Sequence, residues 1–143
     1  MKFKRLKEIR KKKKLKQQDI ADILNVERST YTGWENGKNT IPLKKLISLC
    51  NYYKVSLDFI TGISQKNNYE KLSIDLKVIS TNLKKFRKEK SLKQKEIYKR
   101  LKISSSSYSS YETGKILIPT YYIYTITKNY NYSIDKIFKK QQS

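Results

Sequence analysis

Residues 28–33 carry side chains that hydrogen-bond in a directed way, and their spacing lets them share one side of a helix. Arg28, Ser29 and Thr32 stand at positions i, i+1 and i+4, and Gly33 leaves the same side open. A guanidinium donates two parallel hydrogen bonds, and a hydroxyl donates or accepts one. This set can recognise a flat array of donors and acceptors, such as base-pair edges, but it holds no group that exchanges protons near neutral pH.

Catalytic chemistry has little support elsewhere in the chain. Histidine is absent, which removes the usual general base and the usual zinc ligand. The single cysteine, Cys50, follows the mostly apolar stretch 46–49, which predicts a buried thiol rather than a nucleophile. The serines of residues 104–110 have no histidine to activate them. The sequence therefore predicts no enzyme, no metal site, no cofactor and no small-molecule ligand.

The formal charge of the 143-residue chain is +21, from 33 basic and 12 acidic side chains. Fifteen basic and six acidic residues give +9 for residues 1–62, and sixteen against five give +11 for residues 73–143. Both halves are basic, which favours a polyanion: DNA, RNA or an anionic membrane surface. No apolar run approaches the ~18–20 residues of a membrane span, and no secretory signal follows the basic N-terminus. We therefore expect a cytoplasmic protein with no membrane partner.

The chain repeats itself. Residues 6–62 align with residues 83–139 at a constant offset of 77, and 21 of the 57 aligned positions are identical. A unit of this size can bury a small core of its own. The sequence therefore predicts two like domains, 1–62 and 73–143, joined by a polar and flexible linker at 63–72.

Apolar residues recur at intervals of three and four, which predicts an all-α protein with five helices in each copy. The expected helices of the first copy are 3–13, 17–24, 27–36, 42–53 and 56–61. Those of the second copy are 82–90, 94–101, 105–113, 120–130 and 133–138.

An apolar row of residues leaves the start of the second copy's first helix open. The helix at 82–90 could begin near Ser73, because one apolar row continues towards the N-terminus. That row could pack in the local core, on the first domain or on another chain. It consists of Leu72, Leu76, Ile79, Leu83 and Phe86.

A short helix, a tight turn and a second helix form a helix-turn-helix arrangement at residues 17–36. The run from Leu15 to Lys38 also resembles the phage-repressor and Cro type of DNA-binding domain, the xenobiotic-response-element family, through Gln17, Ala21 and the tetrapeptide Trp34-Glu35-Asn36-Gly37. The resemblance covers residues 4–61 and, more weakly, 79–138. It implies two tandem five-helix domains, double-stranded DNA as the partner, and internal salt bridges Arg10–Glu35 and Arg87–Glu112.

The helix at 27–36 is expected to enter the major groove. Arg28 is the leading base reader, with a phosphate contact as its alternative role, beside Ser29, Thr32 and Gly33. Lys16 and Gln17 start the preceding helix, where side chains and free backbone N–H groups can hold a phosphate. The remaining predicted contacts, to flanking phosphates in the first copy and at equivalent places in the second, are Asn36, Lys38, Lys44, Lys93, Gln94, Ser105, Ser106, Ser110, Thr113 and Lys115.

The second copy departs from the pattern. Its expected recognition helix presents serines and tyrosines instead of a long basic reader, and Tyr98 replaces the small Ala21. Serine discriminates poorly between base edges. The second copy is therefore expected to contact the DNA backbone alone or to act as a pairing domain.

These features predict a sequence-specific transcriptional regulator, a repressor, that acts as a homodimer or as an intramolecular pseudo-dimer. Two alternatives stay open from the sequence. One is an antitoxin-like or RNA-binding module, since the charge also suits RNA. The other is an interaction protein whose second domain recruits a partner.

Overall fold

The computed structural model describes residues 1–140, and these residues form ten α-helices and no strand. The chain divides into two units between Lys71 and Leu72, and each unit is treated by itself below. The all-α prediction is confirmed. The ten helices also reproduce the expected pattern of five for each copy of the repeat.

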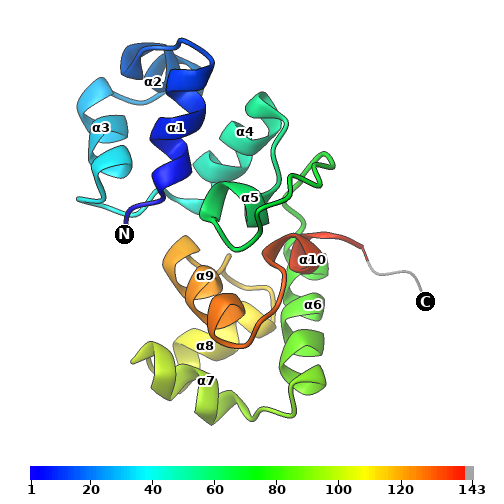
Figure 1. The fold of residues 1–143 in the computed structure, drawn as a ribbon. Coiled ribbons are helices and arrows are strands. Elements are labelled where there is room, and N and C mark those ends of the chain that lie inside the picture. Colours follow the sequence, from blue (N-terminus) through cyan, green and yellow to red (C-terminus); the bar gives the residue numbers. More distant parts are fainter. Residues whose placement is uncertain (141–143) are drawn as a thin grey trace. The chain divides into compact units, whose positions relative to one another are not determined.

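The first unit contains α1 (Lys4–Lys12), α2 (Gln17–Leu24), α3 (Arg28–Asn36), α4 (Leu43–Tyr53) and α5 (Leu57–Thr61) (Figure 1). The bounds of α2 and the C-terminal ends of α3, α4 and α5 agree with the prediction, and the remaining ends differ by one residue. The sequence predicts Pro42 as the first helical residue of α4. In the structure Pro42 is the N-cap, and the helix begins at Leu43. Ser56 caps α5, because its Oγ accepts a hydrogen bond of 3.1 Å from the N–H of Phe59.

The core of the first unit lies between α1, α2, α4 and the inner side of α3. Leu6, Ile20, Tyr31 and Leu46 are fully buried there. Cys50 is also fully buried, which agrees with the expectation of a structural thiol. Because α3 gives only its inner side to this core, its outer side is left for other contacts.

The second unit contains α6 (Leu76–Glu89), α7 (Gln94–Leu101), α8 (Ser105–Glu112), α9 (Thr120–Asn129) and α10 (Ile134–Phe138). Helix α6 extends N-terminal to the range 82–90, as the apolar row allowed. It begins at Leu76 and not at Ser73. The carboxylate of Asp75 fixes that start by accepting from the N–H groups of Lys77 and Val78 at 3.0 and 3.2 Å.

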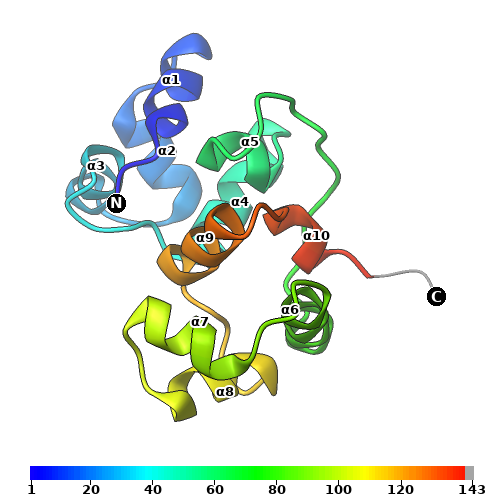
Figure 2. The ribbon, with the colours of Figure 1, turned by 60° about the horizontal axis from the view of Figure 1, so that its bottom comes forward.

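Most of the apolar row that runs from Leu72 to Phe86 packs in the second unit's own core. Helix α6 packs against α8 and α10, and Figure 2 shows it nearly end-on beside α10. Ile79, Leu83 and Phe86 are buried, and the Phe86 ring lies 4.7 Å from the Tyr132 ring between centroids. Leu76, at 37% exposure, is the residue of this row in α6 that remains accessible.

The segment expected to be a flexible linker is held on the first unit. The guanidinium of Arg5 donates to the carbonyls of Phe59 and Ser64, the latter at 2.6 Å. Asn67 accepts from the N–H of Ser56 at 2.8 Å, and the Tyr69 hydroxyl donates to Asn51 at 3.1 Å. Polar residues of this segment therefore bind it to the first unit through hydrogen bonds.

Gly37 has two structural reasons to be glycine. Its φ of 83° is left-handed, and a Cβ added there would lie 2.7 Å from the Cβ of Lys2. Gly62, with φ of 86°, is equally left-handed but has open space around it. The two glycines therefore separate backbone strain from steric contact.

We predict that Gly62→Ala lowers the free energy of unfolding by about 1 kcal/mol, the cost of a left-handed side chain. Gly37→Ala should lower the free energy of unfolding further, because the backbone at Lys2 must also move. Chemical denaturation of the two variants measures the difference. Equal losses would mean that the contact with Lys2 adds nothing.

Candidate nucleic-acid interface

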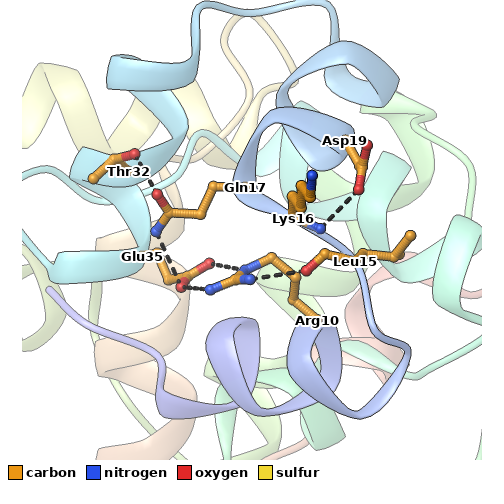
Figure 3. Close-up of polar contacts among 7 residues, drawn as sticks. All are labelled: Arg10, Leu15, Lys16, Gln17, Asp19, Thr32 and Glu35. Carbon is orange, nitrogen blue, oxygen red and sulfur yellow. Dashed lines mark hydrogen bonds and ion pairs between the residues drawn. The ribbon is translucent and has the colours of Figure 1, made fainter.

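A buried ion pair joins α1 to α3 in the first unit. The Nε and Nη2 atoms of Arg10 donate to the two carboxylate oxygens of Glu35 at 2.8 and 2.7 Å (Figure 3). Glu35 is 1% exposed. The remaining Nη1 of Arg10 donates to the carbonyl of Leu15 at 2.9 Å, in the turn before α2. One guanidinium thus fixes α1, α3 and the entry to α2 relative to one another.

The pKa values of the pair follow from this geometry. The hydrogen bond to Glu35 raises the pKa of Arg10 above its ordinary value. Burial alone would raise the pKa of Glu35, but the hydrogen bonds from Arg10 and Gln17 outweigh it, so the pKa of Glu35 lies below its ordinary value. Both groups are therefore charged across the neutral range.

The amide of Gln17 is held at both ends. Its Nε2 donates to Glu35 at 3.3 Å, and its Oε1 accepts from the hydroxyl of Thr32 at 2.8 Å (Figure 3). Thr32 was expected among the base readers. Its hydroxyl donates its one hydrogen bond to Gln17, so towards another partner it can only accept. Gln17 retains one N–H for an external acceptor, and Thr32 sets the direction in which that N–H points.

The outer side of α3 is open. Arg28 and Ser29 are exposed, and the side chain of Arg28 forms no hydrogen bond or ion pair within residues 1–140. Gly33 is buried, and a Cβ added there would make only an ordinary contact, at 3.8 Å from Asn39. One shallow depression is lined by six of the predicted residues: Arg28, Ser29, Thr32, Gly33, Asn36 and Lys38.

The remaining predicted residues of the first unit lie at helix starts. Lys16 is exposed at the N-cap of α2, and its N–H donates to the carboxylate of Asp19 at 2.7 Å. Gln17 follows as the first residue of α2 and is half-buried. Lys44 is exposed in the first turn of α4.

The second unit repeats the ion pair. Arg87 donates to Glu112 at 2.8 and 3.1 Å and to the carbonyl of Leu92 at 3.0 Å. Gln94 donates to Glu112 at 3.2 Å, as Gln17 does to Glu35. Within residues 1–140, however, no hydrogen bond joins Ser109, the equivalent of Thr32, to the amide oxygen of Gln94. The two glutamines are therefore positioned differently.

Most serines of α8 are engaged within their own helix. The Oγ of Ser104 accepts from the N–H of Ser107 at 3.1 Å and lies 3.2 Å from the Oγ of Ser106. Ser110 donates to the carbonyl of Ser107 at 2.6 Å. The other predicted residues of this unit are accessible, with Gln94 half-buried and the following exposed: Lys93, Ser105, Thr113 and Lys115.

Other kinds of site find no support in the described part of the chain. No group of histidine, cysteine, aspartate and glutamate there could hold a metal ion. Among the same residues, no helix has the length and apolar character needed to cross a bilayer.

Comparison with known proteins covers both units. Residues 6–60 match a family model described as "Helix-turn-helix", and residues 81–143 match one described as "Helix-turn-helix domain". Three similar curated proteins, all from Bacillus subtilis (strain 168), are HTH-type transcriptional regulators. YobD is 35% identical over 82 residues, which is 57% of this chain and 67% of YobD. No solved structure was found to match the chain.

The other two relatives align over shorter segments. YqaE is 46% identical over 55 residues, 38% of this chain and 47% of that protein. AnsR is 33% identical over 76 residues, 53% of this chain and 66% of that protein. The chain thus spans about half to two thirds of the length of these relatives.

We predict that Glu35→Gln lowers the free energy of unfolding by about 3 kcal/mol at pH 7, because it leaves Arg10 buried without its counter-charge. The pKa of Glu35 is lowered in the folded state, so its contribution is present above pH 4.5 and is lost as pH falls through the folded value. The difference between wild type and variant should therefore shrink in acid.

Denaturation between pH 7 and pH 2 measures this difference. Glu8→Gln is the matched control, because Glu8 is exposed on α1 and its substitution should have little effect. A gap between wild type and Glu35→Gln that stays constant down to pH 2 contradicts the assignment.

Proposed function

Since the chain belongs to the helix-turn-helix family of transcriptional regulators, we propose that it is a repressor that reads a specific duplex operator with the exposed side of α3. The observation that carries the proposal is the exposed guanidinium of Arg28 in the first turn of α3, which has no partner within residues 1–140. The major groove, about 12 Å wide, admits a helix. No residue is assigned a catalytic step.

Base reading is assigned to the first turn of α3. The two parallel N–H groups of Arg28 match O6 and N7 of guanine, the commonest specific contact in protein–DNA complexes. Ser29 lies next to Arg28 and offers a hydroxyl to an adjacent base or phosphate. At Gly33 the absence of a side chain lets the backbone of α3 come close to the base edges.

Backbone contacts are assigned to the residues around α3. Gln17 directs its remaining N–H from the positive end of α2 towards a phosphate, and Thr32 holds that amide in place. Lys16, Asn36, Lys38 and Lys44 supply further donors around the same surface. Such contacts set the register of the protein on the duplex and carry no sequence information of their own.

The second unit is assigned a supporting role. Its α8 presents Ser105 and Ser106 in place of Arg28 and Ser29. With a charge of +11 for residues 73–143, it can still contact phosphates through Lys93, Gln94 and Lys115. Either a homodimer or the two units of one chain would then occupy half-sites one turn, about 34–36 Å, apart.

Repression is the mode of regulation that DNA binding alone supplies, because a protein seated on a promoter excludes polymerase. The test is selection of binding sites from a random duplex pool by the full-length chain. Affinity for the selected site and for random DNA is then measured between 50 and 200 mM salt. We expect a preference of about 10³-fold or more above a salt-dependent background. Equal affinity for both duplexes contradicts the proposal.

Arg28→Ala should weaken binding to the selected site by about 1–3 kcal/mol and relax the preference at one base pair. Arg28→Lys is the control, since it keeps the charge but cannot donate two bonds in one plane. Repeating the site selection with both variants measures the effect. A uniform loss across all sequences would assign Arg28 to a phosphate.

Ser106→Ala and Ser110→Ala should leave the preferred site unchanged. The hydroxyl of Ser110 is bonded to the carbonyl of Ser107 at 2.6 Å, and Ser106 lies in contact with Ser104. Site selection with the double variant measures this directly. A new preferred sequence would give the second unit a reading role.

A further inference from the structure

Five lysines lie in the last turn of α1 and in the turn that leads into α2. We call Lys11, Lys12, Lys13, Lys14 and Lys16 the lysine turn. All five are exposed, and none forms an ion pair within residues 1–140. The turn is therefore a dense patch of positive charge that the described part of the chain leaves unneutralised.

This patch has a fixed position. The N–H of Lys14 donates to the carbonyl of Lys11 at 2.9 Å, and the N–H of Leu15 donates to the carbonyl of Arg10 at 3.1 Å. Arg10 in turn donates to the carbonyl of Leu15 at 2.9 Å with the same guanidinium that holds Glu35. The lysine turn is thus tied to α3 through the buried ion pair, unlike the charges of a loose tail.

The lysine turn also lies next to the proposed DNA-binding surface. It leads directly into Gln17, whose amide accepts from Thr32 of α3 at 2.8 Å (Figure 3). Along the chain, Lys11, Lys13 and Lys14 directly precede the proposed phosphate contacts Lys16 and Gln17. A duplex that follows this edge would meet positive charge past the base pairs that α3 can reach.

The fold itself does not require this charge. At the equivalent positions the second unit has Lys88, Glu89, Lys90, Ser91 and Lys93, a charge of +2 against +5. Glu89 accepts from the hydroxyl of Tyr132 at 3.0 Å and lies 3.9 Å from the ammonium of Lys136. The two turns share their backbone, with φ of 58° at Lys14 and 56° at Ser91. The extra charge belongs to the unit that carries Arg28.

Resting on the proposed function, we propose that the lysine turn binds the phosphate backbone of duplex DNA beside the segment read by α3. These contacts add affinity without sequence preference. Each phosphate neutralised makes the slope of log K against log salt steeper by about 0.9. The footprint of the first unit is therefore longer than its recognition helix alone would give.

Lys14 allows a test that does not endanger the fold. A lysine in the left-handed region is strained, and glycine there is not, so Lys14→Gly removes one charge while relieving the backbone. Lys54 is the matched control. It is also exposed, its φ is 57°, and its carbonyl accepts from Asn67 of the anchored segment at 3.0 Å. Lys54→Gly makes the same change of charge and strain at the C-cap of α4, outside the lysine turn.

Binding of the full-length variants to the selected site and to random duplex is measured against salt. Both variants should unfold at a higher temperature than wild type. Lys14→Gly should weaken binding to both duplexes by the same factor, roughly fivefold at 0.15 M salt, and flatten the slope by about 0.9. Lys54→Gly should bind both duplexes as wild type does.

Each other outcome overturns the inference. Wild-type affinity and slope in Lys14→Gly, or equal losses in both variants, would show that the turn makes no phosphate contact of its own. A changed site preference in Lys14→Gly would make it a base contact. Failure of the proposed function is distinct, because wild-type protein would then bind selected and random DNA equally.

Discussion

The buried ion pair between Arg10 and Glu35 is the constraint on which the proposed interface depends. A charged pair removed from water is favourable only when its remaining hydrogen-bonding groups are also satisfied. Here Leu15 and Gln17 satisfy them, at 2.9 and 3.3 Å. The requirement to complete one buried ion pair therefore places the lysine turn, the start of α2 and the open side of α3 in a single rigid frame. DNA contacts made from such a frame need little ordering when the complex forms.

The two units keep this frame and differ on their surfaces. Arg87 and Glu112 repeat the ion pair, and the turns at Lys14 and Ser91 repeat the left-handed backbone. What changes lies outside: Ser105 replaces Arg28, Ser109 replaces Thr32, and Ser110 replaces Gly33. The conserved interior accounts for the common fold. The altered exterior accounts for the different roles proposed for the two units, with base reading in the first and support in the second.

The sequence predicted what depends on local pattern or on family resemblance, and it missed contacts between distant residues that neither of these indicates. The bounds of α2 and both ion pairs followed from periodicity, residue type or family resemblance. The bond between Thr32 and Gln17 spans 15 residues and has no local signal, so Thr32 appeared only as a base reader. Residues 63–71 appeared flexible because they are polar, whereas Arg5, Asn51 and Ser56 supply the partners that hold them. Polar composition alone does not distinguish a solvated segment from a hydrogen-bonded one.

The central claim is that the first unit meets duplex DNA with the open side of α3 and the edge at the start of α2. Titrating the selected duplex into isotope-labelled full-length protein, with backbone amide shifts followed by NMR, tests it most directly. The account predicts that the largest shifts in the first unit fall in residues 11–17, 28–33 and 36–38, while the anchored segment 63–71 stays nearly unchanged. Shifts concentrated in α5 and in that segment, with residues 28–33 unaffected, would contradict it.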